Sequence, residues 1–242
     1  MHLEYLYTKQ FTVDNADYNG NVTIKCIMEI LQIISTESAN QLGFGHNLVR
    51  SNNLAWVLNK ILIKFNRPIK MREKITFKTW PIQPKRFTAE RDYLALDEEG
   101  NIVFSGTSVW CLIDLTKRTL SSTDVMKDIV TDYSSERAIE GFDFCRFKAN
   151  ETYLSSYSKE IKISEIDINN HVNNTNYYTY AQDCLSKEDY DKTICQLEIK
   201  FIQELHLGDS LTLFYKKEQN KHYIIGKKQD KDVFSALITT ND

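Results

Sequence analysis

Apolar residues recur at helical spacing in two stretches of the chain. In the first stretch they are Ile24, Ile27, Met28, Leu31, Ile34 and Leu42. In the second they are Tyr177, Tyr178, Ala181, Cys184 and Leu185. This spacing places apolar side chains on one side of a helix, so the pattern predicts two amphipathic helices, each with one buried face.

Runs rich in β-branched and aromatic residues follow each helical stretch, and apolar and polar positions alternate in part along them. In the first half they cover residues 54–65, 74–80, 87–96 and 102–114, and in the second half residues 193–202, 210–215, 222–227 and 233–239. Such runs are typical of half-buried antiparallel strands. Each half therefore predicts an α+β fold, with a long helix packed on an antiparallel sheet. The polar, irregular residues 121–150 are expected to connect the halves.

The two halves share short motifs in the same order. Asp17-Tyr-Asn-Gly-Asn-Val22 aligns with Asp167-Ile-Asn-Asn-His-Val172, Ile63-Lys-Phe65 with Ile199-Lys-Phe201, and Val103-Phe-Ser105 with Val233-Phe-Ser235. The second match continues without gaps and pairs Ile69 with Leu205. Three ordered matches indicate a duplicated domain, and their period is too long for a solenoid. We therefore expect two domains, one over residues 1–148 that includes the connecting segment and one over residues 149–242.

Composition and charge restrict the class of protein. A net charge of −3 argues against a nucleic-acid binder, which would carry a strong basic excess. No apolar run approaches the roughly 18–20 residues of a membrane-spanning helix, and no signal-peptide pattern is present, so we expect a cytoplasmic protein. The five cysteines are scattered, odd in number and without a CxxC pair, which indicates neither disulfides nor a zinc site. We expect no cofactor and no metal ion.

The duplicated motif carries an ionisable histidine in only one of its copies. Where the second copy has His171, the first has Asn21, and this asymmetry suggests an enzyme whose active site lies in the second half. Asp167 and Asn169 have a simpler explanation, because both residue types are common in turns and at helix N-caps. Histidine is not a favoured cap. The remaining histidines are expected at the surface; they are His2, His46, His206 and His222.

The run from Asp167 through His171 to Tyr178, placed between a strand and a helix, resembles the acyl-acyl carrier protein (acyl-ACP) thioesterases of plants and bacteria. Residues 108–118, Gly43-Phe-Gly45 and Asn53-Leu-Ala-Trp56 also fit that family. The resemblance covers nearly the whole chain. It implies two hot-dog domains in tandem and hydrolysis of the thioester of fatty acyl-ACP, which releases free fatty acid and ends chain elongation.

The resemblance also implies a set of catalytic residues. The aspartate, asparagine, histidine and glutamate of the family fall on Asp167, Asn169, His171 and Glu204. Thioester hydrolysis needs a base for a positioned water and donors for the developing oxyanion. Either Glu204 or His171 would be the base, Asn169 would orient the water or the thioester carbonyl, and Asp167 would hold the loop. If the backbone is extended here, the side chains of Asp167, Asn169 and His171 project to the same side, because they are two residues apart.

One family position differs in this chain. Plant members have a cysteine directly after the glutamate, and this chain has Leu205 there. The difference argues against a mechanism with a cysteine nucleophile. Cys184 is expected on the buried face of the second helix, where a thiol behaves as a small hydrophobe.

The implied partner is acyl carrier protein, which holds the acyl chain on a phosphopantetheine arm. Carrier proteins are acidic, so a local basic surface is needed, and its candidates are Arg67, Lys70, Arg72, Lys74 and Lys78. Even spacing from Lys70 to Lys78 would place four of them on one face of a strand. An ordinary solvated strand face is the competing interpretation. The protein would be a monomer or a homodimer, with no membrane span.

The first half is expected to bind the acyl chain, because it has lost the catalytic groups but kept a strongly apolar helix. Ile27, Leu31, Trp56 and Leu58 are candidates for the lining of that site or for plain core. Two other functions remain open at this point. One is an acyl-CoA thioesterase, and the other is a non-catalytic acyl-binding hot-dog protein.

Overall fold

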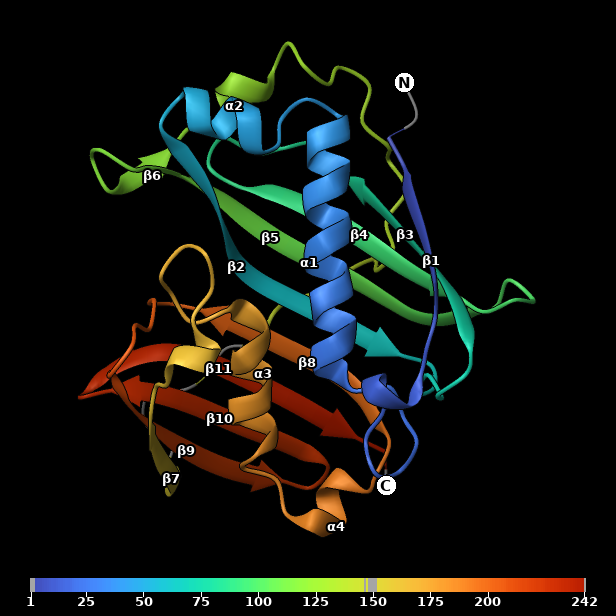
Figure 1. Ribbon diagram of the computed structural model, residues 1–242, viewed down its shortest axis with the longest axis vertical. Coiled ribbons are helices and arrows are strands. Elements are labelled where there is room, and N and C mark those ends of the chain that lie inside the picture. The colour runs from blue at the N-terminus through green and yellow to red at the C-terminus, as the bar shows by residue number, and fades with distance from the viewer. Residues whose placement is uncertain (1–2, 146, 148–151, 242) are drawn as a thin grey trace. The chain divides into compact units, whose positions relative to one another are not determined.

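The computed structural model describes residues 3–145, 147 and 152–241. The chain folds into two compact units, Met1–Phe142 and Asp143–Asp242. In each unit a helix lies across one face of an antiparallel sheet (Figure 1), which confirms the predicted α+β fold. The domain boundary expected between residues 148 and 149 lies outside the described residues.

The sheet of unit 1 has the order β1-β3-β4-β5-β2, with β6 paired to β5. Its strands are β1 (Tyr5–Gln10), β2 (Leu54–Phe65), β3 (Lys74–Pro81), β4 (Ala89–Leu96), β5 (Ile102–Asp114) and β6 (Thr119–Ser121). Its helices are α1 (Ile24–Gln41), α2 (His46–Ser51) and the short 3-10 turns η1 (Val13–Asn15) and η2 (Thr123–Met126). The Thr23 hydroxyl caps α1 by accepting a hydrogen bond from the Cys26 N–H at 3.2 Å.

The sheet of unit 2 has the order β8-β11-β10-β9-β7. Its strands are β7 (Leu154–Glu160), β8 (Ile194–Phe201), β9 (Ser210–Glu218), β10 (Lys221–Lys228) and β11 (Lys231–Thr240). Its helices are η3 (Ile163–Glu165), α3 (Asn174–Gln182) and α4 (Lys187–Tyr190). All pairings in both units are antiparallel, as the alternating runs predicted.

Aromatic and aliphatic side chains join each helix to its sheet. In unit 1, Ile27, Leu31 and Ile34 of α1 are buried, and the Ser35 hydroxyl of α1 lies 2.8 Å from the Tyr93 hydroxyl of β4. In unit 2, the Tyr177 ring of α3 meets the rings of Phe201 and Phe234 edge-on, with centroids 5.4 and 5.3 Å apart. Edge-to-face packing of this kind adds to the free energy gained from burial.

Helix α3 is shorter than the hydrophobic spacing predicted. It has 9 residues against 18 in α1, and Cys184 and Leu185 lie beyond its end. The chain turns there because Ser186 caps a new helix, α4, by accepting a hydrogen bond from the Asp189 N–H at 3.1 Å. The sequence analysis did not predict β1, β6 and β7. Strands β1 and β7 are edge strands without a buried residue, and β6 has 3 residues.

The connecting segment packs on unit 1. Met126 and Val130 are buried with Ala39, Leu42 and Phe44. Further along, the Arg137 guanidinium contacts the Asp92 carboxylate at 2.9 Å. The irregular stretch expected between the halves thus belongs to the first unit as far as Phe142. Nowhere in the described ranges is a helix long and apolar enough to cross a membrane.

The four residues proposed for an acyl-binding site all lie in unit 1. Ile27, Leu31 and Leu58 are buried, and Trp56 is half-buried. The Trp56 indole N–H donates to the Phe44 carbonyl at 3.0 Å, and its ring packs edge-on against the Phe44 ring. These contacts are those of core side chains, so binding of an acyl chain here stays a prediction.

Candidate active site

A tight loop holds the histidine of the duplicated motif. An isolated β-bridge between Ile166 and Val172 closes the loop. Inside it, the Asp167 N–H donates to the His171 carbonyl at 2.8 Å, and the Asn170 N–H donates to the Asp167 carbonyl at 3.0 Å. Asn170 adopts the left-handed conformation with φ of 64°, which asparagine tolerates better than most residues. The segment is therefore a turn, and the extended backbone assumed for Asp167, Asn169 and His171 was wrong.

The Asp167 carboxylate organises this turn. Its Oδ1 atom accepts hydrogen bonds from the backbone N–H of Asn169 at 2.8 Å and, less closely, of His171 at 3.5 Å. The side-chain amide of Asn169 lies 3.5 Å from the other carboxylate oxygen. Neither residue caps the helix, because Asn173 is the N-cap of α3 and accepts from the Thr175 N–H at 3.0 Å. Asp167 and Asn169 thus lie in the turn, as the simpler explanation expected, but the N-cap role that it also offered is wrong.

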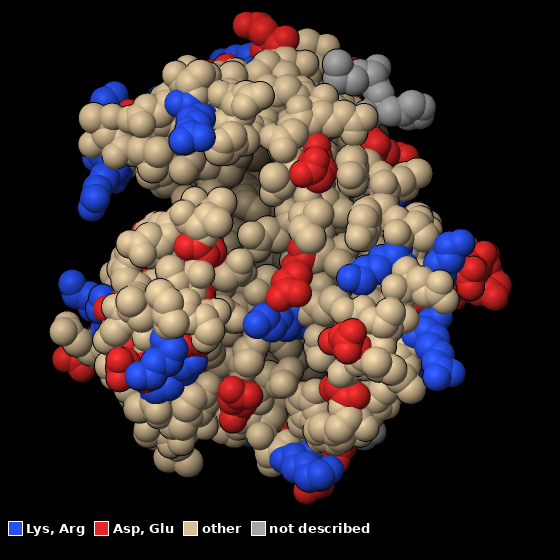
Figure 2. All heavy atoms as spheres, in the orientation of Figure 1, with Lys and Arg blue, Asp and Glu red and all other residues tan. Residues whose placement is uncertain are grey.

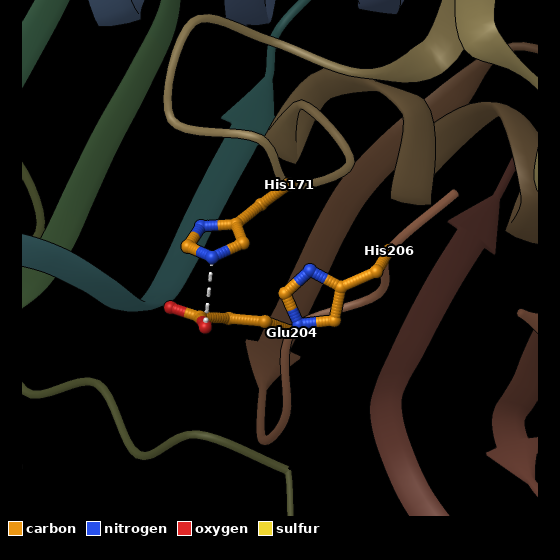
Figure 3. A group of neighbouring side chains, drawn as sticks. All are labelled: His171, Glu204 and His206. Carbon is orange, nitrogen blue, oxygen red and sulfur yellow. Dashed lines mark ion pairs between the residues drawn. The ribbon is translucent and has the colours of Figure 1, made fainter.

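The turn is fastened to the segment that follows β8. The Val172 N–H donates to the Leu205 carbonyl at 2.8 Å, and this bond sets Glu204 beside His171. The His171 Nε2 atom then lies 3.2 Å from the Glu204 Oε2 atom. The side chains of His171 and Glu204 remain 33% and 55% exposed, so water and larger molecules reach the pair. Two residues selected from the sequence are therefore in direct contact, as Figure 3 shows.

A third side chain, His206, completes the group. Its ring packs edge-on against the His171 ring, with centroids 4.8 Å apart. Its Nδ1 atom lies 3.2 Å from the Asn170 carbonyl oxygen, and its backbone N–H donates to the Asp209 carboxylate at 2.9 Å. His206 is exposed, as expected, but the sequence analysis missed its contact with His171.

The equivalent loop in unit 1 has the same backbone hydrogen bonds. Asp17 Oδ1 accepts from the N–H groups of Asn19 and Asn21 at 2.9 and 3.0 Å. The Val22 N–H donates to the Ile69 carbonyl at 2.7 Å, and the bridge between Ala16 and Val22 closes the loop.

The side chains on the unit 1 loop differ. In the place of His171 and His206, unit 1 has Asn21 and Lys70, whose Oδ1 and Nζ atoms lie 2.5 Å apart. The ungapped match of Ile69 with Leu205 aligns Lys70 with His206, and this was the available signal for His206.

The described cysteines lie away from this loop or in protected positions. Leu205, in the place of the family cysteine, is fully buried. Burial raises the pKa of the Cys184 thiol to about 11, and its Sγ atom lies 3.5 Å from the Tyr180 carbonyl oxygen. Burial also raises the pKa of Cys195. Thiols with raised pKa values are poor nucleophiles near neutral pH.

The expected basic surface is smaller than predicted. Strand β3 begins at Lys74, so Lys70 and Arg72 lie in the turn before it, and Arg72 has a φ of 73°. Two of the cations are paired with acids, since Arg67 contacts Glu73 at 2.8 Å and Lys78 contacts Glu4 at 2.5 Å. On the face shown in Figure 2, cationic and acidic side chains are interspersed. Of the predicted group, Lys70, Arg72 and Lys74 are exposed, and Lys70 contacts the Asn21 side chain.

Family models match both units of the chain. The acyl-ACP thioesterase N-terminal domain matches residues 4–133, and the acyl-ACP thioesterase C-terminal domain matches residues 148–241. The chain belongs to the acyl-ACP thioesterase family. This membership confirms the resemblance carried by the duplicated motif, and it covers nearly the whole sequence.

Curated relatives of this thioesterase family member come from plants. It is 25% identical over 194 residues to acyl-acyl-carrier-protein hydrolase FATB3, chloroplastic, of Cuphea viscosissima, covering 75% of this chain and 47% of that protein. It is 23% identical over 270 residues to oleoyl-acyl carrier protein thioesterase 2, chloroplastic, of Arabidopsis thaliana, covering 98% of this chain and 67% of that protein. The chain spans about half the length of the FATB relatives it matches.

Solved structures of the family share the fold. An acyl-ACP thioesterase from Bacteroides thetaiotaomicron superposes with a TM-score of 0.88 at 24% identity, covering 98% of both chains. The 12:0-ACP thioesterase from Umbellularia californica gives a TM-score of 0.89 at 17% identity, covering 100% of this chain and 98% of that one. At these identities the similarity establishes the tandem hot-dog fold.

Proposed function

We propose that this protein hydrolyses the thioester of fatty acyl-ACP and releases free fatty acid. The observation that carries the proposal is the direct contact of His171 with Glu204 on an exposed turn, in a chain of the acyl-ACP thioesterase family. A paired acid and imidazole, accessible to substrate, is the arrangement that proton transfer to and from a bound water requires. The names of the plant relatives agree with this reaction.

Glu204 is the general base in this proposal. An ionised carboxylate only accepts hydrogen bonds, so the 3.2 Å contact requires the His171 Nε2 atom to carry a proton. That nitrogen then has no lone pair with which to take a proton from water. Glu204 keeps a second oxygen for this purpose, and its exposed side chain lets a water reach it. His171 holds the carboxylate in place and gives it a protonated partner.

The turn supplies the remaining groups. Asp167 fixes the loop through backbone hydrogen bonds, and the Asn169 amide, two residues before His171, orients the water or the thioester carbonyl. No cysteine attacks the thioester, because Leu205 occupies the position of the family cysteine and burial raises the pKa of Cys184 and Cys195. Hydrolysis thus proceeds by direct attack of water on the thioester carbonyl.

The test is hydrolysis of acyl-ACP and acyl-CoA, followed by the release of free thiol or fatty acid. Glu204→Gln and His171→Gln should each lower kcat by about 10²–10⁴-fold, as the loss of general base catalysis does. Gln203→Ala, an exposed neighbour, is the matched control and should keep the unmutated rate. Full rates in both site variants would refute the site. Faster turnover of acyl-CoA than of acyl-ACP would show that the substrate is acyl-CoA. Acyl binding without turnover would favour a non-catalytic protein.

A further inference from the structure

The three side chains His171, Glu204 and His206 lie beside one another at the surface of unit 2 (Figure 3). One ligand atom from each lies within 4.8 Å of those of the other two, and no second group of this kind occurs in the part of the chain that the structure describes. Two imidazoles and one carboxylate form a donor set that zinc ions bind readily in proteins. The reaction proposed above uses His171 and Glu204 and leaves His206 without a role.

We propose that this cluster is a binding site for Zn²⁺ and that the bound ion inhibits the hydrolase. The ligands would be the Nε2 atoms of His171 and His206 and a carboxylate oxygen of Glu204. Solvent would fill the remaining position of a tetrahedral ion. The inhibitory half of this proposal rests on the proposed function, whereas the binding half does not.

The hydrogen bond of His206 prepares its ring as a ligand. A carbonyl oxygen only accepts, so the 3.2 Å contact with Asn170 places the proton of the neutral ring on Nδ1. The Nε2 atom is then left with its lone pair. Protein histidines that bind metals are commonly oriented in this way, by a carbonyl or carboxylate on the other ring nitrogen.

The cluster must close slightly to hold the ion. Zinc bonds to nitrogen and oxygen ligands measure roughly 2.0–2.2 Å, which separates tetrahedral ligands by about 3.3–3.5 Å. The contact between His171 and Glu204 is already 3.2 Å, and the group extends to 4.8 Å at most. Glu204 and His206 have exposed side chains, so small rotations achieve the closure. His171 adopts the tautomer with its proton on Nδ1, and no proton has to leave.

This arrangement explains why zinc would inhibit. The carboxylate that should accept a proton from water would instead hold the ion, and so would the imidazole beside it. Because the cysteines form no CxxC pair, the sequence predicted no metal. The cluster escaped that criterion because its ligands come from two separated segments, which the hydrogen bond from Val172 to the Leu205 carbonyl brings together.

The direct test is calorimetric titration of the metal-free protein with ZnCl2 at pH 7.5, with MgCl2 as the control cation. We expect one saturable Zn²⁺ site and no Mg²⁺ binding, since Mg²⁺ prefers oxygen ligands in octahedral geometry. His206→Gln replaces the imidazole with a polar amide and should weaken Zn²⁺ binding at least about 10-fold. Even mutations of residues that only hydrogen-bond to a metal ligand lower metal affinity by that factor. His46→Gln, an exposed histidine of unit 1, is the matched control and should bind as the unmutated protein does.

Two further measurements separate binding from inhibition. Binding should weaken between pH 7.5 and 5.5, because protonated imidazoles cannot act as ligands. Added Zn²⁺ should slow fatty acid release by the unmutated protein. The fractional slowing should be much smaller in His206→Gln, with each protein compared with its own rate without zinc. Equal zinc affinity in His206→Gln and the unmutated protein, or no saturable site, would overturn the proposal. Zinc binding with unchanged or faster hydrolysis would overturn the inhibitory role, and an inactive protein would still report binding.

Discussion

At the scale of single residues, an aspartate has the same structural role in each unit. Asp17 and Asp167 each accept backbone hydrogen bonds that close a turn, although only the second turn carries a histidine. The motif aspartate is therefore needed for the shape of the loop in both units. In the proposed reaction, Asp167 acts indirectly, by fixing the position of His171.

The two aspartates form a matched pair for mutation. Asp17→Ala and Asp167→Ala should lower the free energy of unfolding by similar amounts, about 0.5–1.5 kcal/mol, since each removes hydrogen bonds to turn N–H groups that water can still reach. Only Asp167→Ala should also lower the rate of thioester hydrolysis. Urea unfolding and a steady-state assay on both variants measure the two effects. An equal loss of activity in both would mean that the aspartate acts through stability alone.

The cysteines provide a second test at this scale. Burial raises the pKa of Cys184 to about 11 and also raises that of Cys195, so little thiolate exists near neutral pH. We expect Cys195→Ser and Cys184→Ser to hydrolyse acyl-ACP at the unmutated rate. Mass spectrometry after a rapid acid quench should detect no acyl-enzyme. An acyl group trapped on any cysteine would contradict direct attack by water.

The sequence placed His171 and Glu204 in one site but did not predict the packing of His206. The first followed from family resemblance, residue by residue. The second depends on how the chain turns after β8, where neither helical nor strand periodicity applies. The order of side chains around Asn170 was also beyond prediction, because its left-handed conformation reverses the direction that an extended chain would give.

At the scale of elements, hydrophobic patterns predicted most strands to within a few residues. Strands β2 and β5 begin and end where the apolar runs do, because both are well buried. The edge strands β1 and β7 escaped notice, since exposed positions fill much of their length. The prediction for His222 of β10 was also wrong. This histidine was expected at the surface and is fully buried, with its Nδ1 atom 2.8 Å from the Tyr215 hydroxyl.

Burial of His222 should make stability depend on pH. Desolvation lowers the pKa of this ring below its usual 6.5, against the opposing charge of Asp189. The unfolded chain therefore binds a proton at a higher pH than the folded one, and stability falls as pH drops below about 6.5. His222→Gln should flatten this part of the curve of unfolding free energy against pH, while His46→Gln should not. Parallel curves for both variants and the unmutated protein would exclude His222 as the cause.

Gly226 of β10 should resist substitution. A Cβ atom at this position would lie 2.2 Å from Cε1 of Phe234, whose ring is fully buried beside Tyr177. Gly226→Ala should therefore lower the free energy of unfolding by about 1–3 kcal/mol through overpacking. A double-mutant cycle with Phe234→Ala measures the coupling. The same cost in both backgrounds would show that the ring is not responsible.

At the scale of the whole molecule, three short motifs indicated a duplication, and the chain folds into two compact units. Charge was harder to interpret. Part of the positive charge of the basic run is neutralised in the fold. Arg67 pairs with Glu73 and Asp97, and Lys78 pairs with Glu4. Sequence neighbours show where basic residues cluster, but only the fold shows which acids come to lie beside them.

Arg72 and Lys74 are two of the three exposed cations of this basic run, the third being Lys70, and they test the docking proposal. Charge reversal by Arg72→Glu and Lys74→Glu should raise KM for acyl-ACP and leave kcat and the turnover of a short thioester unchanged. The effect should shrink with added salt, because exposed charges are screened within about 10 Å at 0.1 M ionic strength. Charge reversal at Lys117 and Lys127, exposed elsewhere on unit 1, is the control. Equal losses on both substrates would remove this surface from the account.

The two turns also show that one backbone can carry different sets of side chains. The same main-chain hydrogen bonds hold Asn21, Pro68 and Lys70 in unit 1 and the aligned His171, Glu204 and His206 in unit 2. Protein designers usually have to invent both the backbone and the chemistry of a site. Here the hydrogen-bonded turn is present twice, and the three candidate functional side chains are found in unit 2. Unit 1 is therefore a scaffold on which the side chains of the proposed site can be placed by substitution, because it already has the backbone of the turn.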